Sequence, residues 1–216
     1  MPMTKPSLSL AVVAALAGSA GLVACLRAPE ANIEVFTRAM NEYLAERGQL
    51  CLAKNAWPID VTQHEVDIGA RNAVQMPVLE RLGLVSSSVA EVDIDDEGTP
   101  RRMAVRRYAL TDAGRSYFVR RGPASAGNVR GDFCAASLSL DRIVDWRLDP
   151  NPRGRARRAT VTYTYRIVAA PWARDPQVQK VFPVVAGVVR GAGKAQLQEM
   201  FTLTDHGWVA VDPRDA

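Results

Sequence analysis

Apolar residues occupy every second position over much of the last third of the chain. Between residues 159 and 167, threonine or arginine separates Ala159, Val161, Tyr163, Tyr165 and Ile167. A period of two is typical of a strand with one buried face. In a second run, 138–148, even-numbered positions that would share one face of a strand hold the apolar residues Leu138, Leu140, Val144, Trp146 and Leu148. The turn at 149–154 joins the two runs, and further strands are predicted at 196–204 and 208–211.

Helical spacing of apolar residues predicts three longer helices. The first begins at Pro29 and ends at Gly48, with Phe36 and Met40 on its apolar stripe. The second covers about 70–83, and Pro77 must lie in its first turn or kink it. The third opens with Asp175 as its N-cap and carries Pro183 as a kink.

Two extended runs, 85–95 and 101–110, flank the polar segment 96–100 and predict a hairpin. Thr111 then caps a short helix. The segment 123–131, PASAGNVRG, is the best candidate for a boundary, and it divides the chain into subdomains at 25–122 and 129–216.

The start of the chain differs from the rest. The 216 residues are 48% hydrophobic and 23% charged, which indicates a folded globular protein and excludes a disordered tail or a multi-span membrane protein. After Lys5, the 16 residues from Leu8 to Val23 carry no charge, and roughly 20 are needed for a membrane-spanning helix. A charged start, a short apolar middle and small residues at the end predict a signal peptide over 1–24.

Leu22-Val23-Ala24-Cys25 resembles the lipobox of bacterial lipoproteins. In that family the cysteine is lipidated and the peptide before it is removed, so the resemblance implies that Cys25 is the acylated first residue. Because Leu26, rather than aspartate, follows the cysteine, the resemblance to this family also implies delivery to the outer membrane. The tether to a helix at Pro29 is then about four residues, at most roughly 14 Å if extended. An ordinary signal peptide or a buried helix is the alternative.

Three cysteines occur, Cys25, Cys51 and Cys134. If Cys25 carries lipid, two remain, and an oxidising periplasm would allow a disulfide between Cys51 and Cys134. Two buried free thiols are the alternative.

Charge is uneven along the chain. Residues 30–100 hold 13 acidic and 5 basic side chains, whereas 101–158 hold 14 basic and 5 acidic. In one interpretation the two segments neutralise each other in the fold. In the other, a basic face contacts anionic lipid headgroups. Its arginines are those of the hairpin, Arg101, Arg102, Arg106 and Arg107, and those of the turn, Arg153, Arg155, Arg157 and Arg158.

No motif indicates catalysis, a cofactor or a metal site. His64 and His206 are the two histidines, and each is adjacent to a carboxylate that faces another way. The sequence contains no HExxH motif and no glycine-rich phosphate loop. We therefore expect no catalytic, cofactor-binding or metal-binding residues.

One fragment resembles a DNA-binding module. The segment 78–85, the basic hairpin, and 107–114 (RYALTDAG) resemble the recognition helix and wing of winged-helix regulators. The resemblance covers about 70–118 and implies contact with DNA through the helix and the wing. An exported protein does not meet DNA, so we interpret the fragment as a fold used for protein contact.

These observations predict an α+β fold: an N-terminal helical half with a winged-helix-like hairpin, then an antiparallel sheet with one packed helix. We expect a periplasm-facing lipoprotein, on the outer rather than the inner membrane, with a non-enzymatic binding or support role. Its partners would be the membrane, through the lipid anchor, and an unknown envelope protein or polymer, with no nucleic acid. The alternatives are a membrane-anchored or cytoplasmic winged-helix regulator, and an envelope hydrolase without a recognisable motif.

Overall fold

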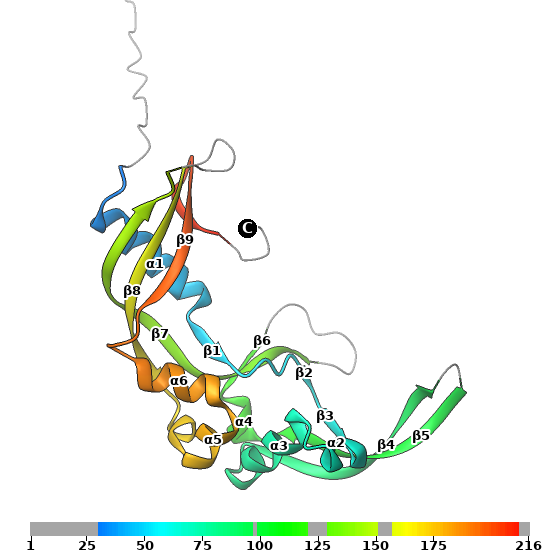
Figure 1. Ribbon diagram of the computed structural model, residues 1–216. Helices are drawn as coiled ribbons and strands as arrows, with labels where there is room; N and C mark the ends of the chain where they lie inside the picture. The colour runs from blue at the N-terminus through cyan, green and yellow to red at the C-terminus, as the bar shows by residue number, and fades with distance from the viewer. Residues whose placement is uncertain (1–29, 97–98, 121–128, 151–156, 212–216) are drawn as a thin grey trace, which may run out of the picture.

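One long strand, β7 (Val129–Leu148), organises the larger of two antiparallel sheets. The structure is a computed structural model that describes residues 30–96, 99–120, 129–150 and 157–211 (Figure 1). The large sheet has the order β1-β7-β8-β9-β10, and two short strands also pair with β7. Its other strands are β1 (Gln49–Cys51), β2 (Ala56–Trp57), β6 (Phe118–Arg120), β8 (Arg158–Ala169), β9 (Leu197–Thr204) and β10 (Gly207–Ala210).

The hairpin predicted in the first half belongs to a second sheet. Strands β4 (Val85–Asp96) and β5 (Thr99–Leu110) pair along their whole length, and β3 (Ile59–Thr62) pairs with the other edge of β5. Two helices, α2 (Gln63–Asp67) and α3 (Arg71–Arg81), lie between β3 and β4 in the chain. Thr111 caps α4 (Asp112–Arg115), as predicted, because its side chain accepts the N–H of Gly114.

The first helix, α1 (Ile33–Arg47), covers one face of the large sheet (Figure 1). It begins four residues later than predicted, because the side chain of Asn32 accepts the N–H of Val35 and closes its first turn. Phe36 and Met40 are fully buried among side chains of β7, β8 and β9. The second core lies around β3, α3, Phe133 and the helices after β8. Each core therefore draws on both of the ranges 25–122 and 129–216.

Pro183 separates two helices instead of kinking one. After the 3₁₀ turn η1 (Pro171–Arg174), the chain forms α5 (Pro176–Val181) and α6 (Pro183–Gly191). Between them Phe182 has φ −121° and ψ 68°, a non-helical conformation. A proline disfavours the helical conformation in the residue before it, and this explains the break.

Two bulges change which residues of β7 are buried. The pairing of β7 with β8 shifts between Leu140 and Arg142 and again between Ile143 and Asp145. Each bulge adds one residue to one strand and reverses the alternation that follows. Ile143 is therefore buried and Val144 is 40% exposed, which corrects the prediction that Val144 faces the core.

The predicted disulfide is confirmed. Cys51 on β1 lies opposite Cys134 on β7, and the two are bonded. The bond joins residues 83 apart in sequence, so it ties the strand after α1 to the centre of the large sheet.

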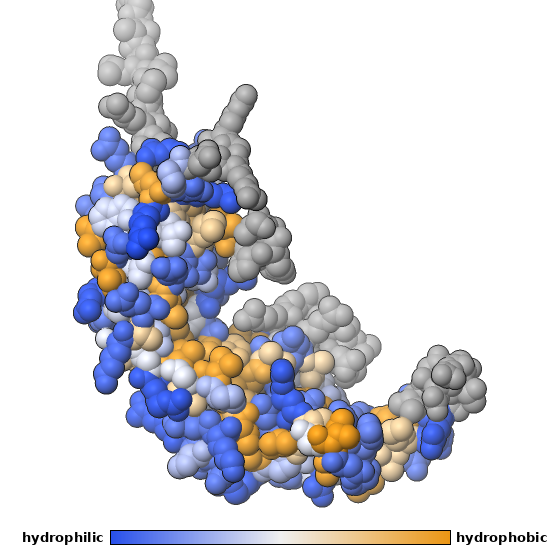
Figure 2. All heavy atoms as spheres, viewed as in Figure 1, coloured by the Kyte–Doolittle hydropathy of each residue, from blue (hydrophilic) through white to orange (hydrophobic). Residues whose placement is uncertain are grey.

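The two sheets meet at an angle, and the molecule is curved. In Figure 1 the strands β7 to β10 with α1 form one limb, the β4–β5 hairpin projects from the other, and α3, α5 and α6 lie at the bend. Figure 2 shows hydrophobic surface over α2 in the second limb, where Val66 and Ile68 are more than half exposed.

Replacing Phe36 by alanine should weaken the folded state strongly, because Phe36 is fully buried against Trp208 with 5.1 Å between ring centroids. A buried phenylalanine truncated to alanine costs about 3–5 kcal/mol. Ile33→Ala is the matched control on the same helix, since Ile33 is 54% exposed. Urea unfolding of both variants checks this, and equal losses would mean that α1 is not docked on the sheet.

Removing the disulfide should also destabilise the protein. In the chain-entropy model, a loop of this length contributes on the order of 4 kcal/mol. We expect Cys51→Ala with Cys134→Ala to lower the free energy of unfolding by about 2–5 kcal/mol in guanidinium denaturation. A non-reducing thiol count provides the direct check, because two free thiols at these positions in the native protein would contradict the bond.

Candidate functional site

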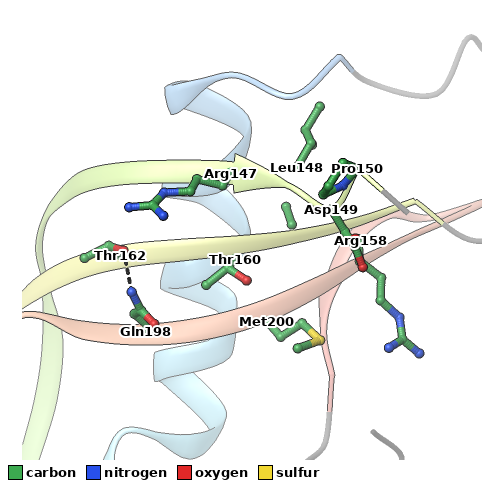
Figure 3. Close-up of a pocket in the computed structure, with 10 residues that line it drawn as sticks. Arg147, Leu148, Asp149, Pro150, Arg158, Thr160, Thr162, Gln198 and Met200 are labelled. Carbon is green, nitrogen blue, oxygen red and sulfur yellow. Dashed lines mark hydrogen bonds between the residues drawn. The ribbon is translucent and has the colours of Figure 1, made fainter. Parts of the chain in front are cut away.

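A shallow pocket lies on the large sheet where β7 ends and β8 begins. Its volume is about 410 Å³. Figure 3 shows the residues that line it. The polar and charged side chains that line it are Arg147, Asp149, Arg158, Thr160, Thr162 and Gln198. Leu148, Pro150, Ala159 and Met200 complete the lining.

Strand alternation builds this surface. Ala159 and Val161 point toward α1 and are buried, so Thr160 and Thr162 face the other way. The pairing register of the neighbouring strands places Arg147 of β7 and Met200 of β9 on either side of Thr160. In the next row, Gln198 Nε2 donates a hydrogen bond to Thr162 Oγ1 at 3.3 Å (Figure 3).

The two arginines give the pocket a basic character. Arg147 Nε lies 3.5 Å from Asp145 Oδ2, but both side chains are more than half exposed, so the pair contributes little to stability. Arg158 is half-buried, and its carbonyl accepts the N–H of Asp149 at 2.9 Å, which holds the two ends of the turn together. A guanidinium stays protonated and presents only donors. The arrangement therefore suits the binding of anionic groups rather than proton transfer.

The first described helix begins at this same end of the sheet. Helix α1 runs antiparallel to β7: the ring of Phe36, near its start, lies 5.9 Å from that of Trp146, and Gly48, at its end, accepts the N–H of Leu138. Trp146 lies next to Arg147, which lines the pocket, so the first turn of α1 and the pocket share one end of the limb. Figure 1 shows the start of α1 beside the end of β7.

The site residues that the sequence predicts form three groups in the structure. Cys25, Arg153 and Arg155 lie outside the described residues. Arg158 lines the pocket, and the exposed Arg157 precedes it. Cys51 and Cys134 lie toward the other end of β7, where they form the disulfide.

Two arginines of the basic hairpin are paired with carboxylates from the acidic segment. Arg102 lies 3.7 Å from Glu91 and 3.5 Å from Asp93 across the β4–β5 pairing. Arg107 makes two hydrogen bonds of 2.7 Å to Asp60, and these raise the pKa of Arg107 above its ordinary value. For this part of the chain, the two oppositely charged segments do meet in the fold.

Sequence reasoning missed Arg147, Thr160, Thr162 and Gln198 as members of one site. The alternation in the sequence indicates that Thr160 and Thr162 lie on the polar face of their strand. The bulges in β7, which the sequence does not show, decide that Arg147 lies opposite Thr160. The two histidines are exposed, and Glu65 beside His64 completes a capping box with Thr62. Among the described residues, no group of three His, Cys, Asp or Glu could hold a metal ion.

Within the described ranges, no helix has the length and apolar character needed to cross a membrane. Comparison with known protein families, curated proteins and solved structures finds no match for this chain.

Proposed function

We propose that the protein is a lipid-anchored lipoprotein of the bacterial envelope that binds or supports another envelope component without catalysing a reaction. Cys25 carries the anchor, and the arginine-lined end of the large sheet contacts anionic headgroups. The outer membrane, on its periplasmic side, is the proposed location, because Leu26 follows the cysteine.

One observation carries this proposal: the first turn of α1 and the arginine-lined pocket occupy the same end of the sheet. Six residues lie between Cys25 and Asn32, so the two Cα atoms are at most about 25 Å apart when the segment is extended. An acylated Cys25 would therefore hold Arg147, Arg157 and Arg158 near the bilayer. Each arginine near an anionic surface contributes about 1 kcal/mol to membrane attraction.

The disulfide also supports an exported protein. Structural disulfides persist in oxidising compartments such as the periplasm and are rare in the cytosol. The bond between Cys51 and Cys134 uses both cysteines that remain when Cys25 is lipidated.

Contacts around α3 and the hairpin weigh against a DNA-binding role. Arg81 on α3 is held by Asp175, with 2.9 Å between Nη2 and Oδ1. Arg102 lies close to two carboxylates on the same hairpin. Phosphate contact requires arginines and lysines that are available to neutralise the backbone. For the hydrolase alternative, the arginine-lined pocket offers no residue pair suited to general acid–base catalysis.

Metabolic labelling with a palmitate analogue tests the anchor. The full-length wild-type chain should incorporate the label, and Cys25→Ala should lose it entirely, because the acyl group is attached to that residue. Cys51→Ala, which leaves Cys25 intact, is the control and should keep the label. An unlabelled wild type, or equal labelling of Cys25→Ala, would contradict the proposal.

Flotation with liposomes rich in phosphatidylglycerol tests the basic end. A chain that begins at Leu26 should associate with these vesicles, and alanine at Arg153, Arg155, Arg157 and Arg158 should weaken association roughly a hundredfold or more at low salt. A matched control replaces four exposed arginines outside this end, Arg101, Arg102, Arg106 and Arg174. If the two variants bind equally well, the sheet end does not face the lipid.

A further inference from the structure

A second pocket, of about 400 Å³, lies between the β1–β2 loop and the start of α3. Among the side chains that line it are Lys54 and Asn55 from the loop, Glu65 from α2, and Arg71 and Asn72 from α3. It lies at the opposite end of β7 from the arginine-lined pocket, because β2 pairs with β7 at Arg130.

Lys54 is the unusual residue here. Lys54 is only 6% exposed. Its ammonium donates one hydrogen bond, of 2.5 Å, to Asn72 Oδ1. Among the described residues, Lys54 forms no ion pair with a carboxylate. An ammonium has three donors, so two of them lack an acceptor from the described protein.

The local backbone holds Lys54 in this position. Its N–H donates to Oδ1 of the buried Asp132 at 2.9 Å, and the same oxygen accepts the N–H of Phe133. Ala53, just before it, has φ 56°, a left-handed conformation that is uncommon for residues other than glycine. Strained backbone of this kind persists where the surrounding structure fixes it.

Burial without a carboxylate partner disfavours the charged form of Lys54. Burial lowers the pKa of Lys54, the nearby charge of Arg71 lowers it further, and Asp132 acts in the opposite direction. A buried charge is tolerated when it is paired. An anion in the pocket would supply that pairing.

The first turn of α3 adds donors to the same pocket. Its N-cap is Ala70, which makes no side-chain capping bond, and no acidic residue lies in the first turn. The first N–H groups of a helix have no partner inside the helix and carry a partial positive charge. This makes such a terminus suited to an anion, and here it opens on the pocket that Lys54 lines.

Glu65 is the carboxylate in the lining, and it is already engaged. Its Oε2 accepts the N–H of Thr62 at 2.8 Å and the hydroxyl of Thr62 at 3.0 Å. With Lys54 and Arg71 against Glu65, the lining retains an excess of positive charge.

We propose that this pocket binds a small oxyanion, the carboxylate or phosphate group of a ligand. Lys54 and Arg71 supply the charge, and Asn72 and the first N–H groups of α3 supply further donors. The inference does not depend on acylation of Cys25.

Thermal unfolding of the full-length chain in non-ionic detergent tests the site. The probes are acetate and inorganic phosphate, each compared with chloride at matched ionic strength. At a concentration about tenfold above the dissociation constant, a bound anion should raise the unfolding midpoint by about 4 °C. A rise in acetate alone assigns the site to carboxylates, and a rise in phosphate alone assigns it to phosphates.

Two variants and a control decide whether the shift comes from this pocket. Arg71→Gln changes an exposed residue and Lys54→Met removes the buried charge, and both should lose the shift. Lys180→Met alters an exposed lysine on α5 and should keep it. The proposal is overturned if the wild type shows no rise over chloride in either anion, or if Arg71→Gln responds as the wild type does.

Discussion

The rest of the structure depends on the pairing of a single 20-residue strand, β7, with its neighbours. β7 pairs with β1, β2, β6 and β8, carries one half of the disulfide, and contributes to both hydrophobic cores. The N-terminal helix packs against the later part of this strand, and the second sheet lies toward its other end (Figure 1). Because one strand connects them, the arginine-lined end and the Lys54 pocket are held at fixed positions along it. Asp132, which binds the backbone of Lys54, and Arg147, which lines the other pocket, are 15 residues apart in the sequence.

That separation gives the molecule two distinct ends. At about 3.3 Å per residue, 15 residues extend up to roughly 50 Å. In the proposed arrangement, the anchored end keeps its arginines against the headgroups, whereas the other end, with the Lys54 pocket and the hairpin, reaches away from the bilayer. In this proposal, the second limb, which Figure 1 shows at an angle to the first, is the part that contacts another envelope component. Both ends bind anionic groups in this account, but through different chemistry: exposed guanidinium groups at one, and a buried ammonium with a helix terminus at the other.

Local patterns were sufficient to predict most elements, because the spacing of apolar residues and the capping of helix ends depend on residues only a few positions apart. The β4–β5 hairpin, the Thr111 cap and the β8 face all follow from such signals. The helix start was predicted at Pro29, whereas the capping bond of Asn32 places it at Ile33. Val144 was assigned to the wrong face, because bulges arise from pairing between distant segments. The buried state of Lys54 was not predictable either, since it depends on Asp132, which lies 78 residues away in the sequence.

Mass spectrometry of the native protein, purified from its own membranes without reduction, tests the central claim most directly. The account predicts a mature chain that begins at Cys25, carries acyl groups on that residue, and lacks two hydrogens because Cys51 and Cys134 are joined. A protein that retains Met1 and carries no lipid would contradict it.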